Sequence, residues 1–175
     1  MLPPLPSWDG LHPLIVHFPI ALLLVAPLFM VVALLWARAY RVCSLVALTL
    51  VAIGTVAAYL SVQTGEAAAE LAVRTGGVAQ ALEHHEELAE TTSVFFAILT
   101  VVLAIIVIGP LFLKKPLTRS VTIPVQIVFL ATYLLGTTYL ADTAHHGGML
   151  VHEFGVHAMV APSDQPIVPQ QYDDD

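Results

Sequence analysis

Eight histidines have the widest chemistry of any residues in this chain, because an imidazole can ligate a metal, form hydrogen bonds and carry a proton near neutral pH. Two of them, His12 and His17, open the first apolar segment, where Pro13 suits the start of a helix. An imidazole at membrane depth is costly unless it faces the protein interior and has a partner. We therefore expect His17, the deeper of the two, to face the interior and to bind a cofactor.

Six further histidines fall in two other stretches: His84 and His85, then His145, His146, His152 and His157. The first two precede the third apolar segment, and adjacent residues of a helix point to neighbouring faces, so at most one can face the bundle axis. If a helix continues through Gly147 and Gly148, positions 145, 149 and 152 share one stripe of it, and positions 142, 146 and 149 share another. If these glycines break the helix, the segment can fold back over the mouth of the bundle.

The cysteine content limits the kind of cofactor. Cys43 is the single cysteine, which excludes an intrachain disulfide, a cysteine-ligated cluster and the Cys-x-x-Cys-His attachment of a c-type haem. A b-type haem needs only an apolar slot between helices and one or two axial imidazoles. The histidine pattern therefore predicts a haem b near one face of the membrane. Its candidate ligands are His17, His85, His145 and His152.

Two other interpretations remain open. Imidazoles combined with carboxylates also suit Fe, Cu or Zn. The candidate ligands of such a non-haem site are His12, His17, His85, His146, His152 and Glu66. Alternatively, the chain binds no cofactor and is a structural or assembly subunit, in which histidines form hydrogen bonds between helices or respond to pH. A haem absorption band, stoichiometric metal in a colourless protein, or neither would distinguish the three.

Four apolar segments must position these residues. The chain has 175 residues, of which 58% are hydrophobic and 11% charged, as is typical of a membrane protein with several spans. Residues 14–36, 42–62, 94–113 and 121–141 are each long enough to cross the hydrocarbon core as a helix. The sequence thus predicts an all-α integral membrane protein, built as an up-down bundle of four transmembrane helices.

Charge assigns the connections to opposite sides of the membrane. The short connections at residues 37–41 and 114–120 carry five of the six basic residues, and the positive-inside bias makes them cytoplasmic. All eight histidines and all thirteen acidic residues then lie on the other side. We expect a multi-pass protein of the bacterial inner membrane, with both termini and the histidines on the periplasmic face.

Two segments extend beyond the spans. Residues 63–72 continue the second helix, Gly76 and Gly77 break it, and residues 78–92 resume a helix that enters the third span. These extensions predict a helical hairpin on the outer face. Residues 1–161 are expected to form a single transmembrane domain, and the Pro-rich acidic tail at 162–175 is expected to be extended and to lie along a neighbouring subunit.

Three motifs resemble the DUF2231 family of small bacterial membrane proteins. They are the His-Pro-Leu-Ile-Val-His-Phe-Pro-Ile run at 12–20, Thr64-Gly65-Glu66 with the later His85-Glu86-Glu87, and the Gly-Gly-Met-Leu-Val-His-Glu-Phe-Gly-Val run at 147–156. The resemblance covers nearly all of the chain up to residue 156. It implies a four-helix core whose histidines lie at the outer side, as in b-type cytochrome subunits. The family often has an aromatic residue where this chain has His152, and a histidine or tyrosine in place of Phe154, so the chain departs from the pattern there.

These observations together predict a membrane electron-transfer subunit of a respiratory or photosynthetic complex, rather than an enzyme by itself. A haem near the outer face would pass electrons from a quinol to a periplasmic or membrane-attached cytochrome c, which the acidic face would attract. Other membrane subunits would complete the complex. The acidic surface and the lack of a phosphate-binding glycine loop argue against nucleic-acid binding. Spacing alone supports no Ser-His-Asp arrangement, so nothing in the sequence indicates a hydrolase.

Overall fold

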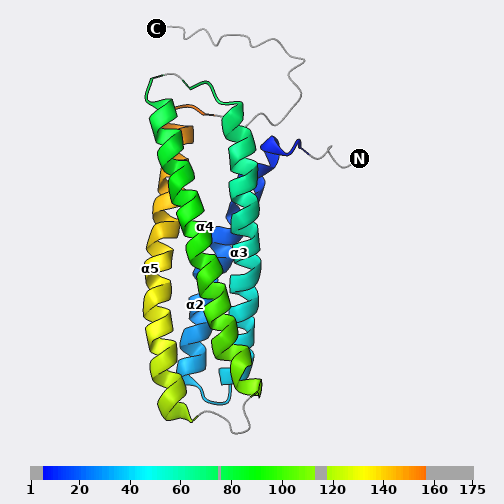
Figure 1. Cartoon of the computed structure of the whole chain (residues 1–175), viewed down its shortest axis with the longest axis vertical. Helices are drawn as coiled ribbons and strands as arrows, with labels where there is room; N and C mark the ends of the chain where they lie inside the picture. Colours follow the sequence, from blue (N-terminus) through cyan, green and yellow to red (C-terminus); the bar gives the residue numbers. More distant parts are fainter. Residues whose placement is uncertain (1–5, 75, 113–117, 157–175) are drawn as a thin grey trace, which may run out of the picture.

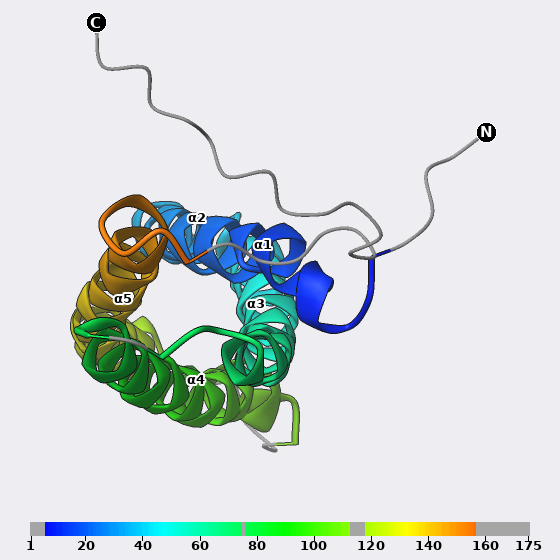
Figure 2. The same cartoon turned by 90° about the horizontal axis from the view of Figure 1, so that it is seen from above.

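The computed structural model describes residues 6–74, 76–112 and 118–156, and within them the chain is helical, with no strand. The elements are η1 (Asp9–Leu11), α1 (His12–Ile15), α2 (His17–Leu35), α3 (Tyr40–Glu70), α4 (Val78–Ile108), η2 (Gly109–Phe112) and α5 (Arg119–His152). They build four long antiparallel rods, and η1 and the end of α5 lie at the same end of the bundle (Figure 1). Viewed along the rods, α2, α3, α4 and α5 follow one another around a ring, and α5 returns beside α2 (Figure 2).

Among the described residues, four helical stretches are long and apolar enough to cross a membrane: Asp9–Leu35, Tyr40–Glu70, Val78–Phe112 and Arg119–His152. The predicted four-helix membrane bundle is therefore confirmed. At about 1.5 Å per residue, a helix of 31 residues such as α4 is about 46 Å long, which exceeds a hydrocarbon core of about 30 Å. The excess lies at the histidine-bearing end, because α3, α4 and α5 run past the apolar segments there.

The buried residues of each helix recur at alternating intervals of mostly three and four. On α2 they are Pro19, Leu23, Ala26, Met30 and Ala33. On α5 they are Gln126, Phe129, Tyr133, Gly136, Leu140 and Leu150. This is the heptad spacing with which helices pack in left-handed bundles. The spacing fixes which side of each helix faces the interior, and so which histidines do.

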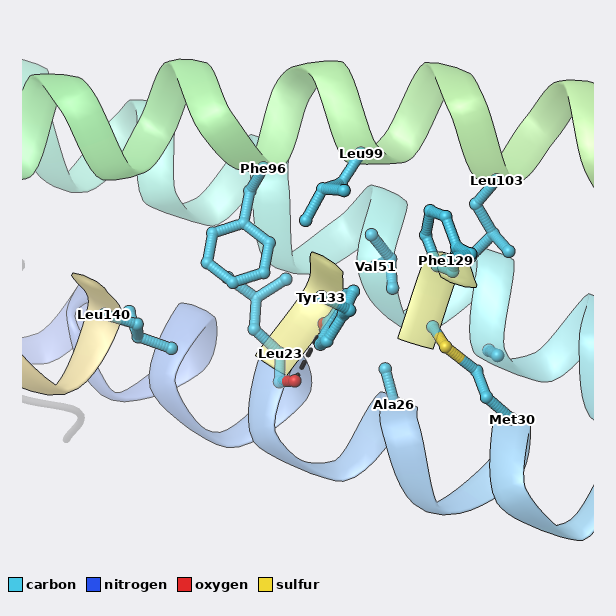
Figure 3. Packing of buried hydrophobic residues seen from close by; sticks show 11 residues of the cluster. Leu23, Ala26, Met30, Val51, Phe96, Leu99, Leu103, Phe129, Tyr133 and Leu140 are labelled. Atoms are coloured by element: carbon cyan, nitrogen blue, oxygen red, sulfur yellow. Dashed lines mark hydrogen bonds between the residues drawn. The ribbon is translucent and has the colours of Figure 1, made fainter. Parts of the chain in front are cut away.

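The middle of the core is closed by aromatic and branched side chains, with Leu23, Phe96 and Tyr133 among the most deeply buried (Figure 3). The Tyr133 hydroxyl donates a 2.8 Å hydrogen bond to the Leu23 carbonyl. In an unbroken α-helix the N–H of residue 27 would bond that carbonyl, but residue 27 is Pro27 and has no N–H. Tyr133 on α5 therefore satisfies a group of α2 that the proline leaves free.

The outer end of the bundle is closed by a second, smaller hydrophobic cluster that includes Ala69, Leu82 and Leu150. The predicted hairpin is present, because α3 ends at Glu70 and α4 begins at Val78. The helix α5 continues through both glycines and ends at His152. Gly155 then adopts φ +65°, which favours glycine, and the Val156 N–H donates a 2.9 Å hydrogen bond to the Leu150 carbonyl. The closing segment thus turns back onto the cluster. His157 and the tail at 162–175 lie outside the described residues.

Candidate functional site

His12 begins α1 and is held against α3. Its Nδ1 lies 2.9 Å from the Ser61 carbonyl oxygen, which can only accept, so Nδ1 donates. The ring rests on Gly65, where an added Cβ would come within 2.9 Å of the imidazole Cε1. In the neutral ring, this hydrogen bond leaves the Nε2 lone pair free for a ligand or a proton. Such a backbone contact is the usual way in which a protein orients a metal-ligating histidine.

His85 lies on α4 and packs against α5. Its ring rests on Gly147, where an added Cβ would come within 3.0 Å of the imidazole Cε1. Just below, towards the core, the Thr92 and Thr143 hydroxyls share a 2.8 Å hydrogen bond that joins the same two helices. Within the described chain, no hydrogen bond of standard geometry reaches the buried Nδ1 of His85, although the Thr143 carbonyl lies close enough to favour a proton on the ring. A buried polar atom without a partner is uncommon and indicates a position prepared for a further interaction.

The electrostatics of His85 favour the neutral ring. His85 lies nine residues before the apolar segment that begins at residue 94, in the part of α4 that extends beyond the span. The pKa of His85 is lowered from 6.5 to about 4, mainly by burial and then by the nearby His12, while the Thr143 carbonyl opposes the change. At neutral pH the ring is therefore uncharged, as a haem or metal ligand must be. His12 and His85 lie at the same end of the bundle, close enough to interact electrostatically.

A second group of histidines lies beside this pair, at the α4–α5 contact. His84 and His146 meet edge to face with ring centroids 4.6 Å apart, and His145 contacts His146 at 5.6 Å. The Nδ1 atom of His146 donates to the Asp142 carbonyl at 3.0 Å and lies 3.3 Å from the Asp142 carboxylate. His84 is exposed and His85 is not, which confirms that only one of the adjacent pair faces inward.

The structure corrects the expected direction of His17. Its side chain is exposed, whereas the sequence predicted that it faces the interior. The reason is its phase on the helix: His17 lies two residues before the buried Pro19, or roughly 200° around the axis at 3.6 residues per turn. His12 lies seven residues before Pro19, two full turns, and therefore shares the inward face.

Three other predicted ligands also lie on the outside. His145 and His152 are exposed on α5, because each is two residues from the inward positions Gly147 and Leu150. Glu66 is exposed on α3, where its carboxylate accepts a 3.2 Å hydrogen bond from Gln63. The structure thus brings together His12 and His85, and separately His84, His145 and His146.

The inward pair could have been found from spacing. His85 lies three residues after the buried Leu82 and seven before the buried Thr92, so it occupies the heptad stripe of α4. Gly65 and Gly147 extend the buried stripes of α3 and α5 in the same way. Which histidines face the interior depends on their phase on the helix, not on their depth in the membrane.

The inward pair offers imidazole nitrogens, which can ligate a haem iron or another metal ion. Among the residues with defined positions, no three His, Cys, Asp or Glu side chains converge as a metal-ion site. A haem iron requires only one or two protein ligands. The orphan nitrogen of His85 and the oriented Nε2 of His12 supply two neutral imidazoles, each packed on a glycine.

Comparison with known proteins identifies the family and nothing finer. Residues 9–159 match the family model described as predicted membrane protein, DUF2231. No curated protein and no solved structure matches the chain. The match covers most of the sequence and agrees with the four membrane-crossing helices. The chain therefore belongs to the DUF2231 family of predicted membrane proteins.

Proposed function

We propose that the protein is an electron-transfer subunit that binds a b-type haem at the histidine-bearing end of its bundle, with His12 and His85 as the residues that hold it. The observation that carries the proposal is the pairing of two inward imidazoles, one oriented by the Ser61 carbonyl and the other buried with an unpartnered nitrogen. A bound haem would supply one-electron transfer at this position.

The residues around the pair would control its surroundings. Gly65 and Gly147 let the two rings pack directly against the neighbouring helices, because a Cβ at either position would crowd the imidazole. The small cluster formed by Ala69, Leu82 and Leu150 lies at the outer end and would limit the access of water. Exclusion of water and the neutral state of His85 would both act on the reduction potential of a bound iron.

The outer histidines have a different place in this proposal. His84, His145 and the half-buried His146 form a group beside the α4–α5 contact, and His146 pairs with Asp142. They are not required as axial ligands, because their helix positions direct them outward.

The partners follow from charge and location. We place the protein in a bacterial inner membrane with the acidic, histidine-bearing end at the periplasm, since five of the six basic residues lie in the short connections at the other end. A quinol would donate electrons from the bilayer, other membrane subunits would surround the helices, and a basic cytochrome c would accept electrons outside. Association with that cytochrome should weaken as salt rises, because screening shortens the range of the attraction.

The test is a reduced-minus-oxidised optical spectrum of the full chain, purified in mild detergent after expression with supplied haem. The variants His12→Phe and His85→Phe keep the ring volume and remove the nitrogens, so both should lose the haem signal. His17→Phe and His152→Phe are matched controls on the outside of the same region and should keep it.

Three results would overturn the proposal. The wild-type protein could be colourless after reconstitution, which would refute haem binding, and stoichiometric Fe, Cu or Zn would then favour the non-haem interpretation. The two inward variants could keep a normal spectrum. Finally, the two control variants could lose the haem spectrum while the inward variants keep it, which would assign the axial ligands to the exposed histidines instead.

A further inference from the structure

A second site lies at the opposite, basic end of the bundle, between α2 and α5. It is a cavity of about 140 Å³, lined by Ala33, Leu34, Ala37, Tyr40, Arg119, Thr122, Ile123 and Gln126. A cavity of about 150 Å³ can hold a molecule the size of benzene. The space is therefore suited to a small group and not to a whole macromolecular segment.

Arg119 brings a positive charge to the mouth of this cavity. Its guanidinium donates a 3.2 Å hydrogen bond to the Leu34 carbonyl, which holds it across from α5 to α2. It is also the first residue of α5, whose first turn has no acidic side chain, so the positive end of the helix dipole adds to its charge. No acidic residue occurs in residues 17–65 or 91–141. The cavity thus presents uncompensated positive charge.

Gln126 supplies the second polar group. It is only 4% exposed, and its Nε2 donates a 3.3 Å hydrogen bond to the Met30 carbonyl. Its Oε1 is buried without a partner among the described residues. Because an amide oxygen only accepts hydrogen bonds, a ligand that satisfies it must carry a donor.

Exposed aromatic residues indicate the depth of the cavity in the bilayer. Trp36, which ends α2, is 65% exposed, and Tyr40, which begins α3, lines the cavity. Tryptophan and tyrosine concentrate at the membrane–water interface. The cavity therefore lies at headgroup level, with apolar side chains of α2 and α5 on its bilayer side.

We propose that this cavity binds the headgroup of an anionic phospholipid that carries a free hydroxyl, of the phosphatidylglycerol type. The phosphate would meet Arg119 and the start of α5, and a headgroup hydroxyl would donate to Gln126 Oε1. Basic pockets between membrane helices are a recognised form of anionic-lipid site. This inference concerns the other end of the bundle and does not depend on haem binding.

The test is native mass spectrometry of the full chain in mixed micelles, with phosphatidylglycerol, phosphatidylcholine and phosphatidylmethanol as probes. Phosphatidylmethanol keeps the anionic phosphate and lacks the free hydroxyls. Wild-type protein should retain phosphatidylglycerol in preference to both. Arg119→Gln should lower that retention about fivefold, the effect expected for one basic residue near a membrane surface. Gln126→Leu should abolish the preference over phosphatidylmethanol.

Two further variants make the result decisive. Arg38→Gln removes an exposed arginine of the same end that does not line the cavity, and should leave retention unchanged. Ala37→Leu fills the cavity without altering a polar group and should lower retention, even if Gln126→Leu fails to fold. Equal retention of the three lipids would overturn the proposal. So would equal losses in the Arg38 and Arg119 variants, full displacement by inorganic phosphate, or co-purification of a quinone that the cavity variants lose.

Discussion

Replacing Tyr133 with phenylalanine should destabilise the bundle through a single hydrogen bond. Tyr133→Phe keeps the ring that packs edge to face on Phe96, with centroids 5.3 Å apart, and removes only the hydroxyl that donates to the Leu23 carbonyl. That carbonyl has no helical N–H partner because Pro27 follows four residues later. The variant therefore leaves a buried carbonyl unsatisfied in the middle of the membrane.

The expected cost is about 1.5 kcal/mol. Hydrogen bonds between membrane helices contribute about 0.6 kcal/mol on average and up to about 1.7 kcal/mol. The upper part of this range applies here because removing one partner leaves the other buried and unpaired. In a Pro27→Ala background the new N–H can bond the Leu23 carbonyl, so the same tyrosine replacement should cost only about 0.5 kcal/mol. The predicted coupling between residues 27 and 133 is thus about 1 kcal/mol.

Reversible unfolding in mixed detergent micelles measures this double-mutant cycle. Tyr139→Phe serves as a control, because Tyr139 lies on the same helix, is 42% exposed and also contacts an aromatic ring. It should change the free energy of unfolding by less than about 0.5 kcal/mol. The reasoning is refuted if Tyr133→Phe is as mild as this control, or if its cost is the same with alanine at position 27.

Three other predictions test the histidine-bearing end and the orientation. Gly147→Ala should lower the melting temperature, because the new Cβ would lie 3.0 Å from the His85 ring, whereas Gly148→Ala has open space and should raise it slightly; equal effects would refute the close contact. Stability in detergent should fall as pH decreases from 6.5 towards about 4. His85 contributes up to about 3 kcal/mol, since the unfolded chain takes up a proton there that the folded chain does not, and His12, whose pKa burial also lowers, adds to the fall. His85→Phe should reduce this dependence, and an unchanged slope would contradict the assignment. Cys43, near the start of α3, should resist labelling by an impermeant thiol reagent added to the periplasmic side of intact cells. Rapid labelling would show that the orientation in the membrane is opposite to the predicted one.

The four spans and the outer hairpin could be predicted because each depends on a property that sequence displays directly. A hydrocarbon core selects length and hydropathy, and Gly76 with φ +56° marks the turn between α3 and α4. Both signals are local. Neither requires knowledge of which helix packs against which.

The direction of the histidines could not be read in the same way. Almost every residue of the first span is apolar, with a mean hydropathy of 2.8, so no polar face shows how the helix is rotated. In the other helices, the spacing of small and weakly polar residues indicates which side of the helix is buried. On α3, Gly54, Ala58 and Ser61 are buried at intervals of four and three, and Gly65 follows four residues later against His12.

The same heptad positions therefore serve two purposes along the bundle. In the middle they hold Phe96 and Tyr133, whose rings fill the core. At the outer end the stripe of α4 holds His85, and the facing positions on α3 and α5 are glycines. Close packing explains these glycines, because an added Cβ would lie 2.9 Å from the His12 ring at Gly65 and 3.0 Å from the His85 ring at Gly147. Packing does not explain why the inward side chains are imidazoles, and the haem proposed above would account for them because it needs their lone pairs.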